Sequence, residues 1–209
     1  MIIKQLIHRY PALSVCEKDI TDAKNMIISC YESGGKLLLA GNGGSSADCD
    51  HIVGELMKGF LKKRPLTKEK REEMKKNFPL LDDEILNGLQ GSLPAISLQS
   101  ATALNSAFSN DENPDLIYAE ATLGFAKPDD ILIAISTSGN SRNVVNAAKV
   151  AKALGAKVIS LTGRDGGALK QISDVTIIAP EYETFKIQEL HLPIYHAICA
   201  AVEDYFFKN

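Results

Sequence analysis

A histidine and a glutamate follow a glycine-rich turn in the first third of the chain. Residues 36–56 read KLLLAGNGGSSADCDHIVGEL, which indicates a short apolar strand, a tight turn and then a helix. The four-residue spacing of His51 and Glu55 places an imidazole and a carboxylate on one face of that helix. The turn exposes backbone N–H groups at a helix N-terminus, where the helix dipole favours an anion such as phosphate. One element therefore offers an anion site beside chemically competent side chains.

A second stretch repeats this design. Residues 131–141 read ILIAISTSGNS, again an apolar strand followed by a turn of small residues. This turn carries four hydroxyl groups, on Ser136, Thr137, Ser138 and Ser141. Taken singly, such a turn can be only a tight connection, and a helical His/Glu pair can be only a surface ion pair. Two turns of one design suggest that a phosphorylated ligand binds between them.

The C-terminal region holds a third group of candidate residues. Residues 184–207 have the pattern of a helix that carries Gln188, Glu189, His191 and His196. Gln188 and His196 are about 80° apart around an ideal helix and roughly 12 Å apart along it, so a shared ligand requires both side chains to lean toward it. Pro193 lies between them and is expected to kink or loosen the helix. Taken alone, His196 also fits a helix histidine with satisfied hydrogen bonds.

The elements that must position these residues alternate along the chain. Short, nearly continuous apolar runs at 36–40, 93–98, 131–135, 157–161 and 175–178 are typical of strands covered on both faces. Helical stretches between them, including 143–154, favour a mostly parallel sheet with right-handed crossovers. Ligands of such sheets bind at the carboxyl ends of the strands, where both turns lie. Residues 1–33 predict two further helices that join near Pro11 and stop at Gly34.

Length and composition indicate a single domain of an ordinary globular protein. The chain has 209 residues, of which 45% are hydrophobic and 23% charged, and a net charge of -3, which gives no reason to expect nucleic acid. Its four cysteines show no CxxC pairing and are expected to be reduced thiols. The apolar N-terminus is interrupted by Lys4, Arg9 and Pro11, which excludes a signal peptide or membrane span there. We expect a soluble cytoplasmic protein with no membrane partner.

Residues 58–91 interrupt the alternation of strands and helices. Nine basic and three acidic residues lie within 58–78, and Thr67 is placed to cap a short polar helix. Such a basic run is able to contact nucleic acid or an acidic partner. We favour a solvated helical excursion near the site or at a subunit contact.

Five motifs, taken in chain order, resemble those of the bacterial phosphoheptose isomerases, which are sugar-isomerase (SIS) domain enzymes. They are GNGGSSADCDHIVGE, SND at 109–111, STSGNS, SLTGRDGG at 160–167 and IQELHLPIYH at 187–196. STSGNS marks the wider SIS fold, whereas HxxxE together with QExHxxxxH points to this branch. The resemblance implies an α/β fold with one SIS domain over 1–209, a five-stranded sheet flanked by helices, N-terminal helices at 1–33 and the excursion at 58–91.

The resemblance also implies an activity. Such an enzyme converts D-sedoheptulose 7-phosphate to D-glycero-D-manno-heptose 7-phosphate through an enediolate, at the head of bacterial ADP/GDP-heptose biosynthesis. It is a homotetramer with active sites at subunit interfaces and one zinc ion per site. By resemblance, the zinc ligands are His51, Glu55, Gln188 and His196, and the acid/base pair is Glu55 and His196. Substrate contacts come from Asn42, Gly43, Gly44, Ser45, Glu55, Asn110, Asp111, Ser136, Thr137, Ser138, Ser141 and Gln188.

Three departures from the family pattern and three other functions bear on this expectation. The excursion after Gly59 is longer than usual, Pro193 stands where the family helix normally has no proline, and Phe185 replaces an acidic residue. A non-catalytic SIS tetramer that binds the bacterial replication initiator has the same fold, but it has no need of convergent ligands. Another aldose-ketose isomerase, such as one acting on arabinose 5-phosphate, usually carries additional regulatory domains. A SIS-type transcription regulator would need a helix-turn-helix domain ahead of the SIS domain.

Overall fold

Five parallel strands form one sheet at the centre of the protein. The computed structural model describes residues 1–207. The strands are β1 (Leu37–Gly41), β2 (Ala95–Ser97), β3 (Ile131–Ile135), β4 (Lys157–Thr162) and β5 (Val175–Ile178). They lie in the order β2-β1-β3-β4-β5, and every neighbouring pair is parallel. The predicted strands are therefore confirmed, and the sheet is wholly parallel.

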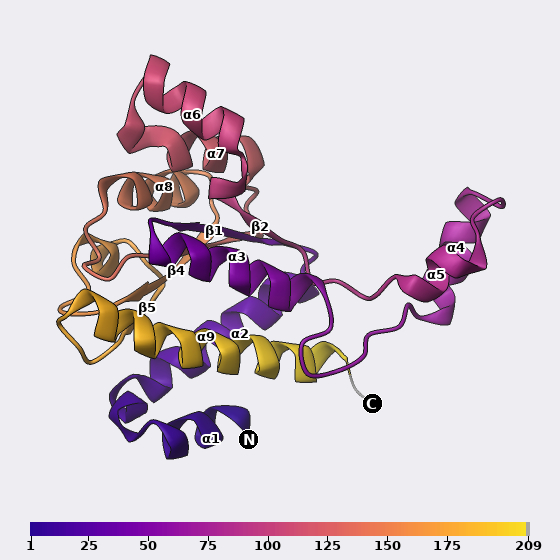
Figure 1. Cartoon of the computed structure of the whole chain (residues 1–209), viewed down its shortest axis with the longest axis horizontal. Helices are drawn as coiled ribbons and strands as arrows, with labels where there is room; N and C mark the ends of the chain where they lie inside the picture. The colour runs from indigo at the N-terminus through magenta and orange to yellow at the C-terminus, as the bar shows by residue number, and fades with distance from the viewer. Residues whose placement is uncertain (208–209) are drawn as a thin grey trace.

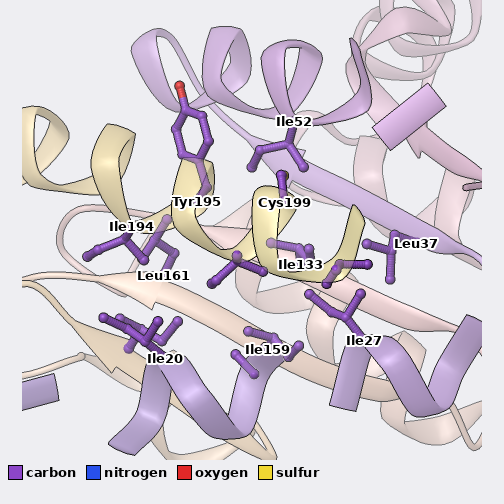
Figure 2. Packing of buried hydrophobic residues seen from close by; sticks show 14 of the residues in the cluster. Ile20, Ile27, Leu37, Ile52, Ile133, Ile159, Leu161, Ile194, Tyr195 and Cys199 are labelled. Carbon is purple, nitrogen blue, oxygen red and sulfur yellow. The ribbon is translucent and has the colours of Figure 1, made fainter. Parts of the chain in front are cut away.

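Helices cover both faces of this sheet (Figure 1). The N-terminal helices α1 (Ile2–Arg9) and α2 (Glu17–Glu32) share one face with α3 (Gly44–Met57) and α9 (Thr184–Phe206). The other face is covered by α7 (Ile117–Phe125) and α8 (Arg142–Ala153), beside which lies α6 (Thr102–Asp111). Successive side chains of a strand point to opposite faces, so Leu37 and Leu39 enter the first core while Leu38 enters the second. Figure 2 shows Ile27, Ile52 and Cys199 meeting in the first core.

The strand order reverses between β1 and β3. The chain moves from β1 outward to β2 and then returns to place β3 on the other side of β1, with Gly41 paired to Ile135. At such a point the turns after the two strands diverge to opposite faces and leave a crevice, where ligands of doubly wound sheets bind. The two turns singled out in the sequence are those that follow β1 and β3.

The N-terminal extension consists of two helices, as predicted. A 3₁₀ turn, Pro11–Cys16, joins α1 to α2 and begins at the expected proline. The chain leaves α2 through Gly34, whose φ of 78° lies in the left-handed region that glycine adopts without strain. Ile20, Ala23 and Ile27 then bury one face of α2 against the sheet.

The excursion between β1 and β2 is an arm that extends from the body of the molecule (Figure 1). It contains α4 (Lys68–Asn77) and α5 (Asp83–Gly88). The Thr67 hydroxyl accepts a hydrogen bond from the Lys70 amide at 3.2 Å, which confirms the predicted cap. No residue of α4 is buried, so this helix is held by its cap and by its charged side chains.

The base of the arm is anchored by a buried ion pair. Arg64 Nε donates to Glu203 of α9 at 2.8 Å, and both side chains are almost completely buried. Glu203 also accepts from the amides of Phe60 and Leu61, each at 2.8 Å. The remaining guanidinium N–H groups donate to the carbonyl oxygens at the end of α3, at 3.1 Å for Glu55. A single pair therefore joins the arm, α3 and α9.

One expectation from composition agrees with the structure of residues 1–207. All four cysteines are buried and free, as expected of reduced thiols. Within the same residues, no helix is both long enough and apolar enough to cross a bilayer. The longest helix, α9, contains Pro193 and continues through it without interruption.

Candidate active site

Three of the predicted side chains converge between α3 and α9, which run side by side (Figure 1). The ligand atoms of His51, Glu55 and His196 all lie within 4.8 Å of one another. Glu55 Oε1 is 3.2 Å from His51 Nε2, which in turn is 3.4 Å from His196 Nε2. The first contact is the predicted one-turn pair on α3, and the second brings together residues 145 positions apart.

The chemistry of this group suits a divalent metal ion. Glu55 Oε2 is buried and has no hydrogen-bond partner among the described residues. An unpartnered carboxylate oxygen in such a place is costly unless a cation or a substrate proton meets it. Imidazole nitrogen and carboxylate oxygen are ligands that zinc prefers. The three residues therefore fit a zinc site, with further positions open to other ligands.

The surroundings of His196 favour the neutral form of its imidazole. Burial lowers the pKa of His196, and the neighbouring His51 lowers it further, whereas the charge of Glu55 acts in the opposite direction. A neutral imidazole has a nitrogen lone pair, which is what a metal ion or a proton needs. Around the ring, His196 makes edge contacts with His51 and Tyr195 at 4.9 Å between centroids, and Phe60 at the base of the arm lies 5.5 Å away.

Two further residues support His51, and neither is predicted from the sequence. The Tyr195 hydroxyl lies 3.0 Å from His51 Nδ1 and donates to Asp48 Oδ1 at 3.2 Å. Burial raises the pKa of Asp48, and burial together with Asp48 raises the pKa of Tyr195. The three-residue spacing of Asp48 and His51 on one helix face is a signal that would have identified Asp48. Tyr195 has no such signal beyond its place before His196.

The first turn lies at the start of α3, as predicted. Asn42 exchanges two amide hydrogen bonds with Asn143 of α8, at 2.8 and 3.0 Å, and thereby ties this turn to the second one. Gly43 has a φ of 55°, a left-handed conformation. A Cβ at Gly44 would lie 2.6 Å from the side-chain nitrogen of Gln188, so a glycine at this position lets the Gln188 amide approach. Ser45 is buried beneath the turn.

The second turn places its hydroxyl groups before α8. Ser136 Oγ and Ser141 Oγ lie 2.9 Å apart, and the Ser138 hydroxyl accepts from the Asn140 amide at 3.2 Å. The carbonyl of Thr137 accepts from the Gly163 amide of the turn after β4, at 3.1 Å. A Cβ at Gly139, whose φ is 67°, would overlap the Gly166 carbonyl of that same turn. The loop is therefore held rigidly with its hydroxyls at the N-terminus of α8, where anions are favoured.

Other predicted residues lie away from the three converging side chains. The amide of Gln188 contacts Gly44, which is about 10 Å from His51 along the axis of α3. Asn110 and Asp111 lie exposed at the end of α6, where the Asn110 amide donates to Asp111 at 2.7 Å. That helix belongs to the opposite side of the sheet from α9 (Figure 1). Within one subunit, the structure thus joins three of the four predicted ligands and leaves Gln188, Asn110 and Asp111 apart from them.

An apolar groove opens beside the site. Its volume is about 860 Å³, and its walls include Leu6 and Tyr10 of α1, Phe60, and Leu192 and His196 of α9. His196 therefore faces both the predicted ligands and this groove. The first of the three sequence departures, the excursion, contributes to the groove through Phe60 and Leu61.

Known proteins similar to this chain belong to one family of enzymes. The SIS domain family matches residues 95–202, a span that includes the second turn and His196 but begins after Glu55. A phosphoheptose isomerase from Aquifex aeolicus is 37% identical over 187 residues, which are 90% of this chain and 84% of that protein. The solved phosphoheptose isomerase of Francisella tularensis is 30% identical to this chain with a TM-score of 0.77, and the match covers 94% of this chain and 91% of that one.

The corresponding structure from Neisseria gonorrhoeae is 29% identical with a TM-score of 0.75, over 96% of this chain and 94% of that one. The values for the Francisella structure describe the same fold over nearly the same span. The aligned regions therefore cover nearly the whole chain. This chain belongs to the phosphoheptose isomerase family of SIS-domain enzymes.

Proposed function

We propose that the protein is a zinc-dependent isomerase that converts D-sedoheptulose 7-phosphate into D-glycero-D-manno-heptose 7-phosphate. This reaction would stand at the head of bacterial ADP/GDP-heptose biosynthesis, in the cytoplasm. The observation that carries the proposal is the convergence of His51, Glu55 and His196 around a buried, unpartnered carboxylate oxygen. Relatives named phosphoheptose isomerase, which match most of the chain, supply the substrate class.

Three protein ligands for zinc come directly from this group. His51 and His196 offer ring nitrogens and Glu55 offers a carboxylate oxygen, and these groups would hold one zinc ion in each subunit. Gln188 is the proposed fourth ligand, and its amide would have to leave Gly44 and turn along α9 to reach the others. When bound, zinc acts as a Lewis acid that polarises the carbonyl and hydroxyl oxygens of the sugar.

The protein supplies the proton transfers. Glu55 Oε2 has no hydrogen-bond partner, so it is free to take a proton from C1 of the ketose and to return it to C2. His196 carries the proton that leaves the hydroxyl on C1 and reaches the oxygen on C2. Between these transfers the substrate is an enediolate, whose charge needs a site that excludes water. The rings of Tyr195 and Phe60 contact His196 and cover part of this site.

The two turns hold the phosphate. The hydroxyls of Ser136, Thr137, Ser138 and Ser141 and the N-terminus of α8 form one side of the crevice, and the turn with Asn42, Gly43, Gly44 and Ser45 forms the other. The reciprocal Asn42–Asn143 amide pair fixes the two sides relative to each other. Because the phosphate lies at the far end of the sugar from the reacting carbons, holding it positions C1 and C2.

The complete site requires a second subunit. Asn110 and Asp111 are proposed substrate contacts, yet they lie on the opposite side of the sheet from α9. A homotetramer with active sites at its subunit interfaces would bring these side chains, from a neighbouring subunit, to the sugar. The groove beside His196 is an apolar surface that such an interface would cover.

The test is turnover of D-sedoheptulose 7-phosphate by the purified protein, by Glu55→Gln and by His196→Ala. We expect turnover by the wild type and a loss of at least ~100-fold in each variant, because each removes a group that transfers a proton. The matched control is Glu84→Gln, which removes an exposed carboxylate of α5 that lies outside the metal group. Turnover of arabinose 5-phosphate alone would instead identify a pentose phosphate isomerase. A stable protein that turns over neither sugar would favour the non-catalytic SIS scaffold.

A further inference from the structure

Two hydrogen-bonded side chains, Tyr195 and Asp48, form a chain that reaches His51 from the side away from Glu55. Asp48 Oδ1 accepts the hydroxyl proton of Tyr195 at 3.2 Å, and the same hydroxyl oxygen lies 3.0 Å from His51 Nδ1. Tyr195 is only 3% exposed, and its ring lies at 5.5 Å and 74° to the ring of His51. Burial and ring contacts therefore hold the hydroxyl between the carboxylate and the imidazole.

Few protons are available for the hydrogen bonds that link Asp48, Tyr195 and His51. A phenol has one proton to donate, and an ionised carboxylate only accepts. When Tyr195 donates to Asp48, its oxygen has only lone pairs left for His51, so Nδ1 of His51 must carry the imidazole proton and donate it. A neutral imidazole carries one ring proton, and His51 Nε2 is then bare. This bare nitrogen is the atom that faces Glu55 and His196.

The opposite arrangement is the alternative to consider. If His51 Nε2 carried the proton, it would donate to Glu55 Oε1 at 3.2 Å, and Tyr195 would turn its proton toward Nδ1. Asp48 would then lose the one hydrogen-bond donor that the structure gives its side chain in the described residues. In the first arrangement, by contrast, Asp48 keeps its hydrogen-bond donor. The carboxylate left without a donor is then that of Glu55, where the ligand atoms converge. Both arrangements carry the same total charge, so hydrogen-bond geometry decides between them.

We propose that Asp48 and Tyr195 are positioning residues that hold His51 in its Nδ1–H tautomer and so present a bare Nε2 to a divalent cation. The partner of the second ring nitrogen commonly sets the tautomer of a metal-binding histidine, and its loss typically weakens metal binding about 10- to 100-fold. This inference rests on the proposed function, since it concerns the metal site of the proposed isomerase.

The direct test is the tautomer of His51 in the metal-free protein. Long-range ¹H–¹⁵N spectra of protein labelled at histidine distinguish a protonated from a bare ring nitrogen, and the His51→Ala variant assigns the signals. We expect Nδ1–H in the wild type. Asp48→Asn should reverse the direction of both hydrogen bonds. The new amide donates to the Tyr195 oxygen, so the phenol proton turns toward His51. Tyr195→Phe should likewise shift His51 toward Nε2–H, whose remaining partner is Glu55.

Zinc affinity, measured by competition with a chromophoric chelator, is the second readout. Tyr195→Phe and Asp48→Asn should each weaken zinc binding about 10- to 100-fold while their circular dichroism stays that of the wild type. Tyr205→Phe is the matched control, since Tyr205 lies on the same helix as Tyr195 and its hydroxyl donates to Glu32 of α2, outside the site. We expect Tyr205→Phe to bind zinc as the wild type does.

Three results would overturn the inference: an Nε2–H tautomer in the metal-free wild type, zinc affinities of both variants within twofold of the wild type, or no zinc binding by the wild type. Neither readout depends on the substrate. An Nδ1–H tautomer and the expected loss of zinc affinity, in a protein that fails to turn over sedoheptulose 7-phosphate, would support the inference and reject only the proposed substrate.

Discussion

A substitution at Gly44 should impair the reaction with substrate while leaving the stability of the fold nearly unchanged. A Cβ at this position would meet the end of the flexible Gln188 side chain, not backbone, so Gly44→Ala should displace that amide at little cost in stability. We predict a fall of at least about tenfold in kcat/KM, because the Gln188 amide, a proposed substrate contact, no longer lies at the first turn. The free energy of unfolding should change by less than about 1 kcal/mol.

Gly54→Ala is the control on the same helix. Nothing lies within 4 Å of a Cβ at Gly54. Alanine there should raise stability by up to about 1 kcal/mol through helix propensity and leave kcat/KM unchanged. Equal kinetics for Gly44→Ala and Gly54→Ala would show that the Gln188 contact has no role in the reaction.

His191 makes the stability of the protein depend on pH. Burial lowers the pKa of His191 from 6.5 to about 4, while its ring Nε2 bonds to the Thr162 carbonyl at 3.0 Å. The unfolded chain therefore binds the proton first as the pH falls. The stability that comes from keeping this histidine neutral is complete above pH 6.5 and is lost progressively between pH 6.5 and about 4. The loss should reach on the order of 3 kcal/mol at the acid end.

Urea unfolding at a series of pH values measures this effect. His191→Gln keeps an N–H group near the position of Nε2 but has no proton to gain, so the difference in unfolding free energy between wild type and variant should shrink as the pH falls from 6.5 to 4. Parallel pH profiles of the two proteins would contradict the assignment.

At the scale of elements, the Arg64–Glu203 pair should be a large contributor to the attachment of the arm. Removal of one partner leaves the other charge buried, which typically costs about 3–5 kcal/mol. We therefore predict that Arg64→Met lowers the free energy of unfolding by this amount. The double variant Arg64→Met/Glu203→Met should recover part of the loss, because no buried charge is then left alone. Chemical denaturation of the two variants tests this, and a single variant as stable as the wild type would contradict it.

The elements that the sequence predicts well are those with local signals. The five strands are continuous apolar runs, and Thr67 precedes a polar helix, so nearby residues suffice to identify both. His51 and Glu55 were found in the same way, through their spacing on one helix. Their pairing with His196 came only from the family resemblance, because no local pattern relates residues on α3 and α9.

The contacts that the sequence did not predict join residues far apart in the chain. The Arg64–Glu203 pair spans 139 positions, the Tyr195–Asp48 contact 147 and the Asn42–Asn143 pair 101. Each depends on the packing of one helix against another, which a single sequence does not specify. The position of Gln188 beside Gly44 is of the same kind, since it depends on how far along α3 the start of α9 lies.

At the scale of the whole molecule, the arm should be separable from the fold. No residue of α4 is buried, and Pro65 pairs with Gln90 where the two ends of the arm meet. We predict that replacing residues 67–89 by a short loop lowers the melting temperature by only a few degrees and leaves zinc binding intact. Calorimetry measures the melting temperature, and chelator competition measures zinc binding. Loss of cooperative unfolding would show that the arm belongs to the core of the subunit.

Size-exclusion chromatography with light scattering then shows whether the arm makes the subunit contacts of the proposed tetramer. The proposed homotetramer should have four times the mass of the chain. A tetramer that persists without residues 67–89 would place the subunit contacts on the body, where the groove beside His196 lies. Dissociation of the shortened protein would place them on the arm.

The most direct test of the account is a zinc titration of the metal-free protein during turnover of D-sedoheptulose 7-phosphate. We predict that the isomerase rate is abolished by complete metal removal, rises in proportion to added zinc and saturates at one zinc ion per subunit. A rate that does not change on complete removal of the metal, or no turnover at saturating zinc, would contradict it.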